Sequence, residues 1–168
     1  KDHYPPASHL ALMYQGFYPR IYDSQLEPSE FYANYLETYV ERDIRQISQI
    51  ANLRLFVTFL KLCAGRIGTM LNFSSLANDT GVSVSTIKHW ISILEASYII
   101  YLLPPYFANI SKRLVKTPKI YFLDTGFAAF LMGIEQISHM ESHPLRGPLF
   151  ENMIIIELLK NRYNHGRL

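Results

Sequence analysis

The 168-residue chain is 49% hydrophobic and 14% aromatic, so it can bury a substantial core, which excludes an intrinsically disordered protein. Its single cysteine, Cys63, leaves no disulfide framework and favours a reducing cytoplasm. The longest apolar stretch, 98–110, is too short to span a bilayer and contains Pro104 and Pro105, so we expect no transmembrane segment and no membrane partner. Because the first residue is Lys1 and not Met, we expect a fragment or a processed product.

The net charge of +2 is distributed unevenly along the chain. Residues 51–123 hold 8 Lys or Arg against 2 Asp or Glu, whereas residues 1–50 hold 4 against 7 and residues 124–168 hold 4 against 5. A positive middle between acidic ends indicates that a polyanion, if one binds, meets the centre of the chain.

Two amphipathic helices are predicted before residue 66. The first begins at Pro28, which suits a first helical turn, and places Phe31, Tyr35 and Tyr39 at steps of four. The second begins after Asn52, a favourable N-cap, and ends at the glycines that follow residue 64. The buried stripe expected for it consists of Leu53, Phe56, Val57, Leu60 and Cys63. A short strand is then expected at 70–73, with Ser74 or Ser75 opening the next helix.

Residues 74–94 have the spacing of a helix-turn-helix. Ala77 is small where the second helix crosses, and Gly81, four residues later, suits a turn that needs a positive φ. Ser83 or Ser85 is expected to cap the following helix. The residues of that helix expected to face the core are Ile87, Trp90, Ile91 and Leu94. The alternative is an ordinary helix pair.

Two strand-like segments follow, at 98–103 and 119–123, which are rich in β-branched and aromatic residues. Two strands joined by a loop directly after such a helix form a wing. The sequence therefore predicts a mainly α fold with a small β wing: a winged helix-turn-helix core over residues 51–131, with flanking helices in residues 1–50 and 132–168.

This core predicts DNA binding. Its candidate contacts on the second helix of the motif are Ser83, Ser85, Lys88, His89 and Ser92, and those on the wing loop are Lys112, Arg113 and Lys116. The exposed helix face lacks Arg, Asn and Gln, which make bidentate contacts to bases, so we expect binding mainly through phosphates. The alternative for the wing is an idle basic surface.

Two short motifs point to other chemistry and are not assigned to it. Asp124 begins an Asp-Thr-Gly triplet like that of an aspartic protease, but only one is present, and an N-cap for the helix 127–132 is the better interpretation. His139 and His143 have helical spacing, but the glutamate offset differs from that of zinc proteases and Pro144 follows, so no metal is expected. No phosphate-binding loop ends in Lys-Ser or Lys-Thr, so we expect no ATP site, no cofactor and no complete catalytic site within these residues.

The last predicted helix, 148–162, is apolar on nearly all sides. We therefore expect other parts of the protein to pack against more than one of its faces. Either it packs under the winged helix, or another subunit or a missing segment buries it.

Several stretches of the sequence resemble the C-terminal region of a prokaryotic family of AAA-type ATPases. They are 37–47 (ETYVERDIRQI), the helix-turn-helix, 102–131 (LLPPYFANISKRLVKTPKIYFLDTGFAAFL) and 147–161 (GPLFENMIIIELLKN). The resemblance implies an ATPase core upstream that uses ATP and Mg²⁺, a winged helix in the middle, and a restriction-endonuclease-like domain that begins with the helix around Glu151. Residues 132–168 would then be a linker and the first helix of that truncated domain. Glu151 would match one metal ligand of such nucleases. The alternative for Glu151 is a carboxylate near a helix start, where the helix macrodipole favours a negative charge.

Two hypotheses of different classes follow. The first is a cytoplasmic DNA-binding fragment of a larger ATPase. The second is a protein-interaction module that docks the ATPase core or another subunit, including a second copy, through the aromatic helix 31–39. A continuous positive face on the exposed helix of the motif would favour DNA, and an apolar patch there would favour docking. A metal-dependent nuclease is the alternative for the full-length protein only.

Overall fold

A computed structural model describes residues 8–39, 52–106 and 117–166. Its elements in chain order are α1 (His9–Gln15), α2 (Pro19–Asp23), α3 (Pro28–Thr38), α5 (Leu53–Ala64), α6 (Phe73–Thr80), α7 (Val84–Ala96), β1 (Ile100–Leu103), β2 (Lys119–Phe122), α9 (Thr125–Leu131), α10 (Ile137–Ser142) and α11 (Arg146–Asn164). The fold is mainly helical with a two-stranded antiparallel sheet, which confirms the predicted fold class.

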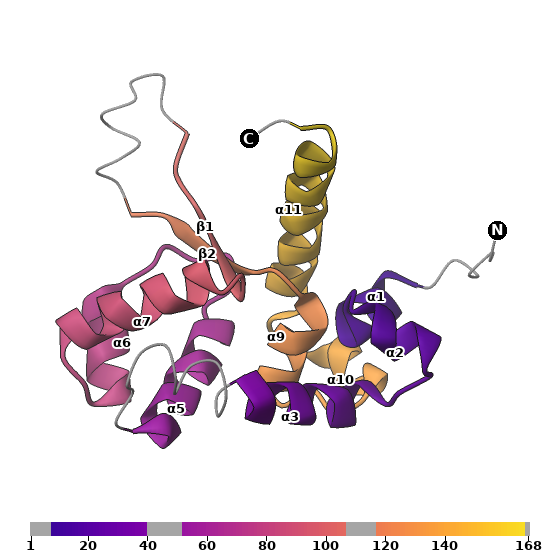
Figure 1. The fold of residues 1–168 in the computed structure, drawn as a ribbon, viewed down its shortest axis with the longest axis horizontal. Helices are drawn as coiled ribbons and strands as arrows, with labels where there is room; N and C mark the ends of the chain where they lie inside the picture. Colours follow the sequence, from indigo (N-terminus) through magenta and orange to yellow (C-terminus); the bar gives the residue numbers. More distant parts are fainter. Residues whose placement is uncertain (1–7, 40–51, 107–116, 167–168) are drawn as a thin grey trace.

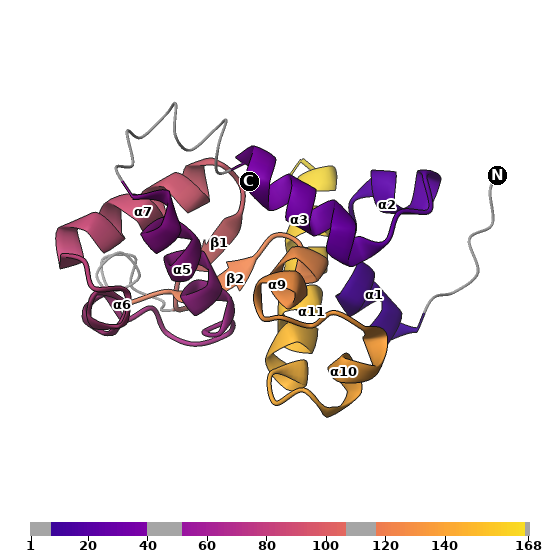
Figure 2. The same cartoon turned by 90° about the horizontal axis from the view of Figure 1, so that it is seen from below.

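The helices α5, α6 and α7 form one lobe together with the sheet, while α1, α2, α3, α9, α10 and α11 gather in a second lobe (Figure 1; Figure 2). Trp90 of α7 anchors the first lobe, because its ring lies 5.3 Å from the rings of both Phe56 and Phe59 of α5. Large aromatic side chains of this kind bury the most apolar area per residue and dominate core energetics. The predicted buried face of α7 is confirmed. On α5, Phe56, Leu60 and Cys63 are buried as predicted, whereas Leu53 and Val57 are only half-buried and Phe59 is buried without having been predicted.

The turn between α6 and α7 has the predicted geometry. Gly81 has φ +77, in the left-handed region, and donates its N–H to the carbonyl of Ala77, which is buried. Ser83, not Ser85, caps α7 and accepts a hydrogen bond from the N–H of Thr86. The cap of α6 was predicted wrongly: Asn72 takes this position and accepts from the N–H of Ser75, so the helix begins at Phe73.

The sheet is a hairpin in which Ile100 pairs with Phe122 and Leu103 with Lys119. A predicted third strand at 70–73 is reduced to a single bridge between Met70 and Lys119. Because α6 already begins at residue 73, the segment has no length left for a longer ladder. It still satisfies the outer edge of β2, where Ile120 donates to the carbonyl of Thr69 at 3.2 Å.

Asp124 lies between β2 and α9, where the two lobes meet. As predicted, it caps α9, and its Oδ1 accepts from the N–H of Phe127 at 2.8 Å. It also accepts the hydroxyl of Tyr32 on Oδ1 at 2.6 Å and the N–H of Phe17 on Oδ2 at 2.7 Å. Burial raises the pKa of this carboxyl, and the three hydrogen bonds, from Tyr32 first, oppose that rise.

α11 attaches to the sheet through a buried amide. Asn152 accepts from the N–H of Phe122 at 2.7 Å and donates to the carbonyl of the same residue at 2.8 Å. Such a pair replaces the two hydrogen bonds that a further strand would make there. Leu149, Met153 and Ile156 are buried on this side of α11.

The opposite side of α11 is open within the part of the chain that the structure describes. Phe150 is 44% exposed, Ile154 43% and Leu158 60%. We predicted that more than one face of α11 would be packed against other segments. Among the described residues, only one face is packed in this way.

Gly126 gives a direct test of the packing around Asp124. A Cβ at this position would lie 2.4 Å from the hydroxyl of Tyr32 and 2.6 Å from the backbone nitrogen of Gly16. We expect Gly126→Ala to lower the free energy of unfolding by about 3 kcal/mol, as overpacking against backbone does. The measurement is urea denaturation followed by circular dichroism.

Gly147 of α11 provides the matched control, because a Cβ there meets nothing within 4 Å. Gly147→Ala should leave stability unchanged or raise it by up to about 1 kcal/mol, through helix propensity alone. Equal effects of the two substitutions would contradict the close approach described above.

Candidate nucleic-acid interface

The five helix residues predicted to contact DNA lie on or beside α7, and all five are exposed: Ser83, Ser85, Lys88, His89 and Ser92. They face away from the core because Ile87, Trp90, Ile91 and Leu94, which alternate with them at helical spacing, are buried against α5 and α6. The structure thus brings this half of the predicted site together on one helix.

The hydroxyl groups on this helix are partly occupied by local hydrogen bonds. The Oγ of Ser83 accepts from the N–H of Thr86 and lies 2.8 Å from the Oγ of Ser85, and Ser92 donates to the carbonyl of His89 at 2.7 Å. Ser83 therefore has a structural role as a cap. Lys88 and His89 remain the cationic or titratable groups of the predicted set on this helix.

Lys88 is held over an aromatic ring at the start of α6. Its Nζ lies 5.7 Å from the ring centroid of Phe73, at the outer limit of a cation–π contact. This contact aligns the lysine stem across the α6–α7 surface and leaves the ammonium exposed. No pattern in the sequence distinguished Phe73 from an ordinary core residue.

The other half of the predicted site, Lys112, Arg113 and Lys116, lies outside the described residues. Lys119, which follows the loop in sequence, is in β2, where its Nζ lies 3.1 Å from Oε1 of Glu151 on α11. The carboxylate therefore reduces the positive charge that this lysine adds at the base of the wing.

Glu151 is the single residue that the sequence relates to a nuclease. Its Oε1 accepts the hydroxyl of Tyr121 at 2.5 Å as well as the ammonium of Lys119. These two hydrogen bonds lower the pKa of the Glu151 carboxyl. In residues 8–39, 52–106 and 117–166, no group of three His, Cys, Asp or Glu side chains could hold a metal ion.

The surface of α7 is neither a continuous positive face nor an apolar patch. Val84, 38% exposed, is its one large exposed hydrophobic residue among those described. Arg66, which follows α5 in the chain, is paired with Asp79 of α6, which neutralises another positive charge. The helix surface is small, hydroxyl-rich and weakly positive, which suits contact with a phosphate backbone better than base reading.

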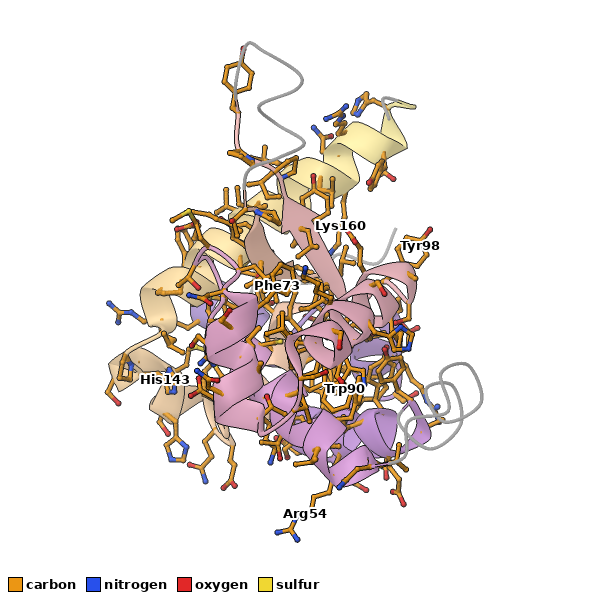
Figure 3. All side chains as sticks on the ribbon, turned by 90° about the vertical axis from the view of Figure 1, so that its left-hand side faces the viewer. Arg54, Phe73, Trp90, Tyr98, His143 and Lys160 are labelled. Carbon is orange, nitrogen blue, oxygen red and sulfur yellow. The ribbon has the colours of Figure 1, made fainter. Side chains whose placement is uncertain are left out.

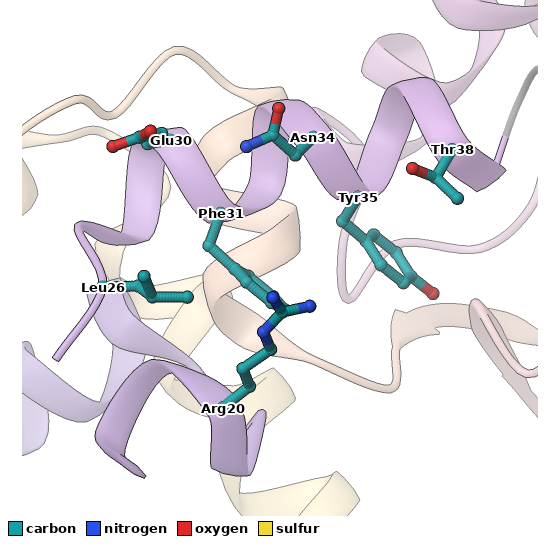
Figure 4. Close-up of a pocket in the computed structure, with 7 residues that line it drawn as sticks. All are labelled: Arg20, Leu26, Glu30, Phe31, Asn34, Tyr35 and Thr38. Carbon is teal, nitrogen blue, oxygen red and sulfur yellow. The ribbon is translucent and has the colours of Figure 1, made fainter. Parts of the chain in front are cut away.

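A second candidate surface lies beside α3, the aromatic helix predicted to dock a protein. A groove of about 330 Å³ is lined by Arg20 and Leu26 on one side and by Glu30, Phe31, Asn34, Tyr35 and Thr38 of α3 on the other. Figure 4 shows the side chain of Arg20 extending toward Phe31. Tyr32, in contrast, is buried behind this groove, so α3 presents only part of its aromatic face.

The fold is thus that of a mainly helical protein with a three-helix and hairpin unit. The chain belongs to the family described as Domain of unknown function (DUF8612), whose model matches residues 8–138. It is also similar to two uncharacterized proteins, one from Mycobacterium bovis and one from Mycobacterium tuberculosis. Each is 32% identical to it over 127 residues, which cover 74% of this chain and 28% of the relative. The chain therefore spans under a third of the curated relatives that it matches.

No solved structure matches the chain. Across the residues that the structure describes, no helix is both long enough and apolar enough to cross a membrane.

The role of Ser83 as the N-cap of α7 can be tested by its effect on stability, separately from any role in binding. Ser83→Ala should lower the free energy of unfolding by about 1 kcal/mol because α7 loses its side-chain cap. Ser92→Ala, which removes an exposed hydroxyl bonded only to the carbonyl of His89, is the matched control. It should change stability by less than about 0.5 kcal/mol. Chemical denaturation of both variants checks this, and an equal loss in the two would contradict the assignment.

The Glu151 contacts predict a pH dependence. Because the folded-state pKa of Glu151 lies below its ordinary value of 4.5, its contribution to stability is present above pH 4.5 and is lost as pH falls through the folded pKa. We expect Glu151→Gln to cost about 0.5 kcal/mol at pH 7, since the pair is exposed and screened by solvent. Urea denaturation should show wild type and variant converging below pH 4.5. A difference that grows on acidification would contradict the pairing.

Proposed function

We propose that the chain is the nucleic-acid-binding part of a larger protein, and that it holds duplex DNA mainly through phosphate contacts. The observation that carries this proposal is the placement of α7. Its core face is packed on α5 through Trp90, and its outward face offers Lys88, His89 and hydroxyl groups on the helix that leads into the hairpin. In winged helix-turn-helix proteins this helix approaches the groove and the wing contacts the backbone.

The charge of the described part supports phosphate contact over base reading. Residues 52–106 and 117–123 hold five Lys or Arg and two Asp or Glu, and the side chains of Lys112, Arg113 and Lys116 would add three more positive charges on the loop between the strands. Affinity built on such contacts falls steeply with salt and discriminates little between sequences.

In this proposal the larger protein is an AAA-type ATPase, as the sequence resemblance implies. The relatives are long enough for a further catalytic core, since the matched region is only 28% of each. ATP and Mg²⁺ would bind there, and any nuclease activity would need carboxylates beyond Glu151. The described residues contribute binding and no chemistry of their own.

The test is fluorescence anisotropy with a labelled DNA duplex at low and moderate salt. We expect binding that weakens with salt. Lys112→Ala/Arg113→Ala/Lys116→Ala and Lys88→Ala should each reduce the slope of log K against log salt, by about one for each phosphate that is no longer neutralised. Arg54→Ala is the control for charge alone, because Arg54 projects from the molecule at the end opposite the hairpin (Figure 3). No binding to any duplex at low salt, or an unchanged triple variant, would overturn the proposal.

The groove beside α3 favours a second candidate function, docking of the ATPase core or of another subunit. Phe31 and Tyr35 are only half-buried along it and Arg20 gives it a charged edge. A docking role is tested by Asn34→Arg, which fills the groove from an exposed position and leaves the core intact. We expect it to weaken association with the separately expressed ATPase core, measured by calorimetry, while duplex binding stays unchanged. Unchanged association would contradict docking at this groove.

A further inference from the structure

A cavity of about 270 Å³ opens where the two lobes meet, on a surface that the proposed DNA contacts do not use. Four segments line it: the turn before α2, the residues after α7, the β2–α9 junction and α11. Its walls are mainly apolar and carry four aromatic rings, and it contains one carboxylate and one ammonium group. The lining residues are Phe17, Tyr18, Pro19, Tyr98, Ile99, Leu123, Asp124, Phe127 and Lys160.

Tyr98 at the rim of this cavity has an unfavourable conformation. Its φ is +57, and its side chain is 80% exposed. The position follows α7, where the N–H of Ile99 bonds back to the carbonyl of Leu94 in the pattern of a helix end that glycine normally occupies. A tyrosine in this left-handed conformation has a steric cost, and packing offsets little of that cost because Tyr98 is largely exposed. The folded state alone therefore gives no reason for an aromatic ring at this place.

Asp124 lines the cavity and has one acceptor position left on its carboxylate. A carboxylate has about four lone-pair directions, and Oδ1 uses two of them on Tyr32 and Phe127. Oδ2 uses one on the N–H of Phe17, so one remains for a donor from a ligand.

Lys160 supplies the complementary donor. Its Nζ lies 4.2 Å from the ring centroid of Phe17 and 2.9 Å from Oε1 of Glu157. An ammonium has three N–H donors, and a single hydrogen bond to Glu157 leaves two of them available. Acceptor and donor thus lie in one cavity between aromatic walls.

The charges of the site favour an uncharged group inside the cavity. An anion would meet the carboxylates of Asp124 and Glu157, and a cation would meet the ammonium of Lys160. A flat, uncharged ring with a donor beside an acceptor on its edge satisfies both groups, and its face can stack on the exposed ring of Tyr98.

We propose that this cavity binds a nucleobase, with the ring stacked on Tyr98, an N–H of its edge donated to Oδ2 of Asp124 and a neighbouring acceptor bonded to Lys160. Every common base presents such a donor and acceptor side by side. The base belongs either to a free nucleotide or to an unpaired nucleotide of a nucleic acid strand, and the proposal stands independently of duplex binding by α7.

The test is calorimetric titration of the chain with three probes. Adenosine monophosphate should bind. Its N6,N6-dimethyl derivative, which has no edge N–H to donate, should bind roughly tenfold more weakly, as expected for the loss of a hydrogen bond to a charged acceptor. Ribose 5-phosphate, which has no base, should not bind. Equal affinity of all three probes would overturn the proposal, because it would place recognition on the phosphate.

Variants separate the site from the fold. Tyr98→Gly should weaken binding of adenosine monophosphate roughly tenfold, the usual effect of removing one stacking ring, while raising the thermal midpoint because the backbone strain disappears. Lys160→Gln should also weaken it. Tyr163→Ala on α11, which removes an exposed tyrosine that does not line the cavity, is the control and should bind normally. Unchanged affinity in Tyr98→Gly, or no binding of adenosine monophosphate at millimolar concentration to wild type, would refute the site.

A further comparison distinguishes the two sources of the base. A short single-stranded oligoadenylate that binds more tightly than adenosine monophosphate, and loses that advantage in Tyr98→Gly, assigns the site to nucleic acid strands. Equal affinity of the two probes assigns it to free nucleotides. Both results support the cavity as a nucleobase site.

Discussion

The hydrogen bonds of the Asp124 carboxylate are the interaction on which the attachment of the hairpin to the second lobe depends. It accepts hydrogen bonds from the backbone of Phe17, from the hydroxyl of Tyr32 and from the first turn of α9. These groups come from three parts of the chain, and Asp124 is 107 residues from Phe17 and 92 from Tyr32. Burying a carboxylate costs free energy that only such a set of donors offsets, so the three segments must arrive together. The glycine at 126 belongs to the same constraint, because any side chain there would occupy the space of the Tyr32 hydroxyl.

This junction places the candidate sites. β2 ends next to Asp124, so the hairpin is fixed to the second lobe at the point where α9 begins, and Asn152 of α11 holds Phe122 of the same strand. α7 is in turn fixed to α5 by Trp90, and its outward face is left free of core packing. The proposed nucleobase cavity lies where the two lobes meet, because its polar residues Asp124 and Lys160 belong to the β2–α9 junction and to α11, which pack together there.

Features set by neighbours in sequence could be predicted. Gly81, Ser83 and the capping role of Asp124 depend on residues within a few positions, so their spacing alone indicates the conformation. The start of α6 was predicted wrongly because Asn72 fell within the strand expected at 70–73, which left Ser74 and Ser75 as the N-cap candidates. The single-sided burial of α11 was missed because its apolar residues lie on nearly all sides of the helix, so periodicity does not select the buried face.

Contacts between distant segments could not be predicted. Nothing near Tyr32 or Phe17 in the sequence indicates a carboxylate partner, and the pairing of Lys119 with Glu151 joins residues 32 positions apart. The positive φ of Tyr98 is invisible in the sequence, where a glycine would have indicated it. Asp124 and Lys160 come together in the cavity only through tertiary structure, so this site could not be predicted either. The exposed face of α7, in contrast, follows from helical periodicity alone.

The central claim, that the hydrogen bond between the carboxylate of Asp124 and the hydroxyl of Tyr32 fixes the end of β2 to α3 of the second lobe, is tested most directly by a double-mutant cycle. The free energy of unfolding would be measured for Tyr32→Phe, Asp124→Asn and the double variant, with Tyr121→Phe in place of Tyr32→Phe as the reference cycle, since Tyr121 bonds Glu151 instead. We predict a coupling of about 1 kcal/mol or more between Tyr32 and Asp124 and additive effects in the reference cycle. Additive effects in both cycles would contradict the account.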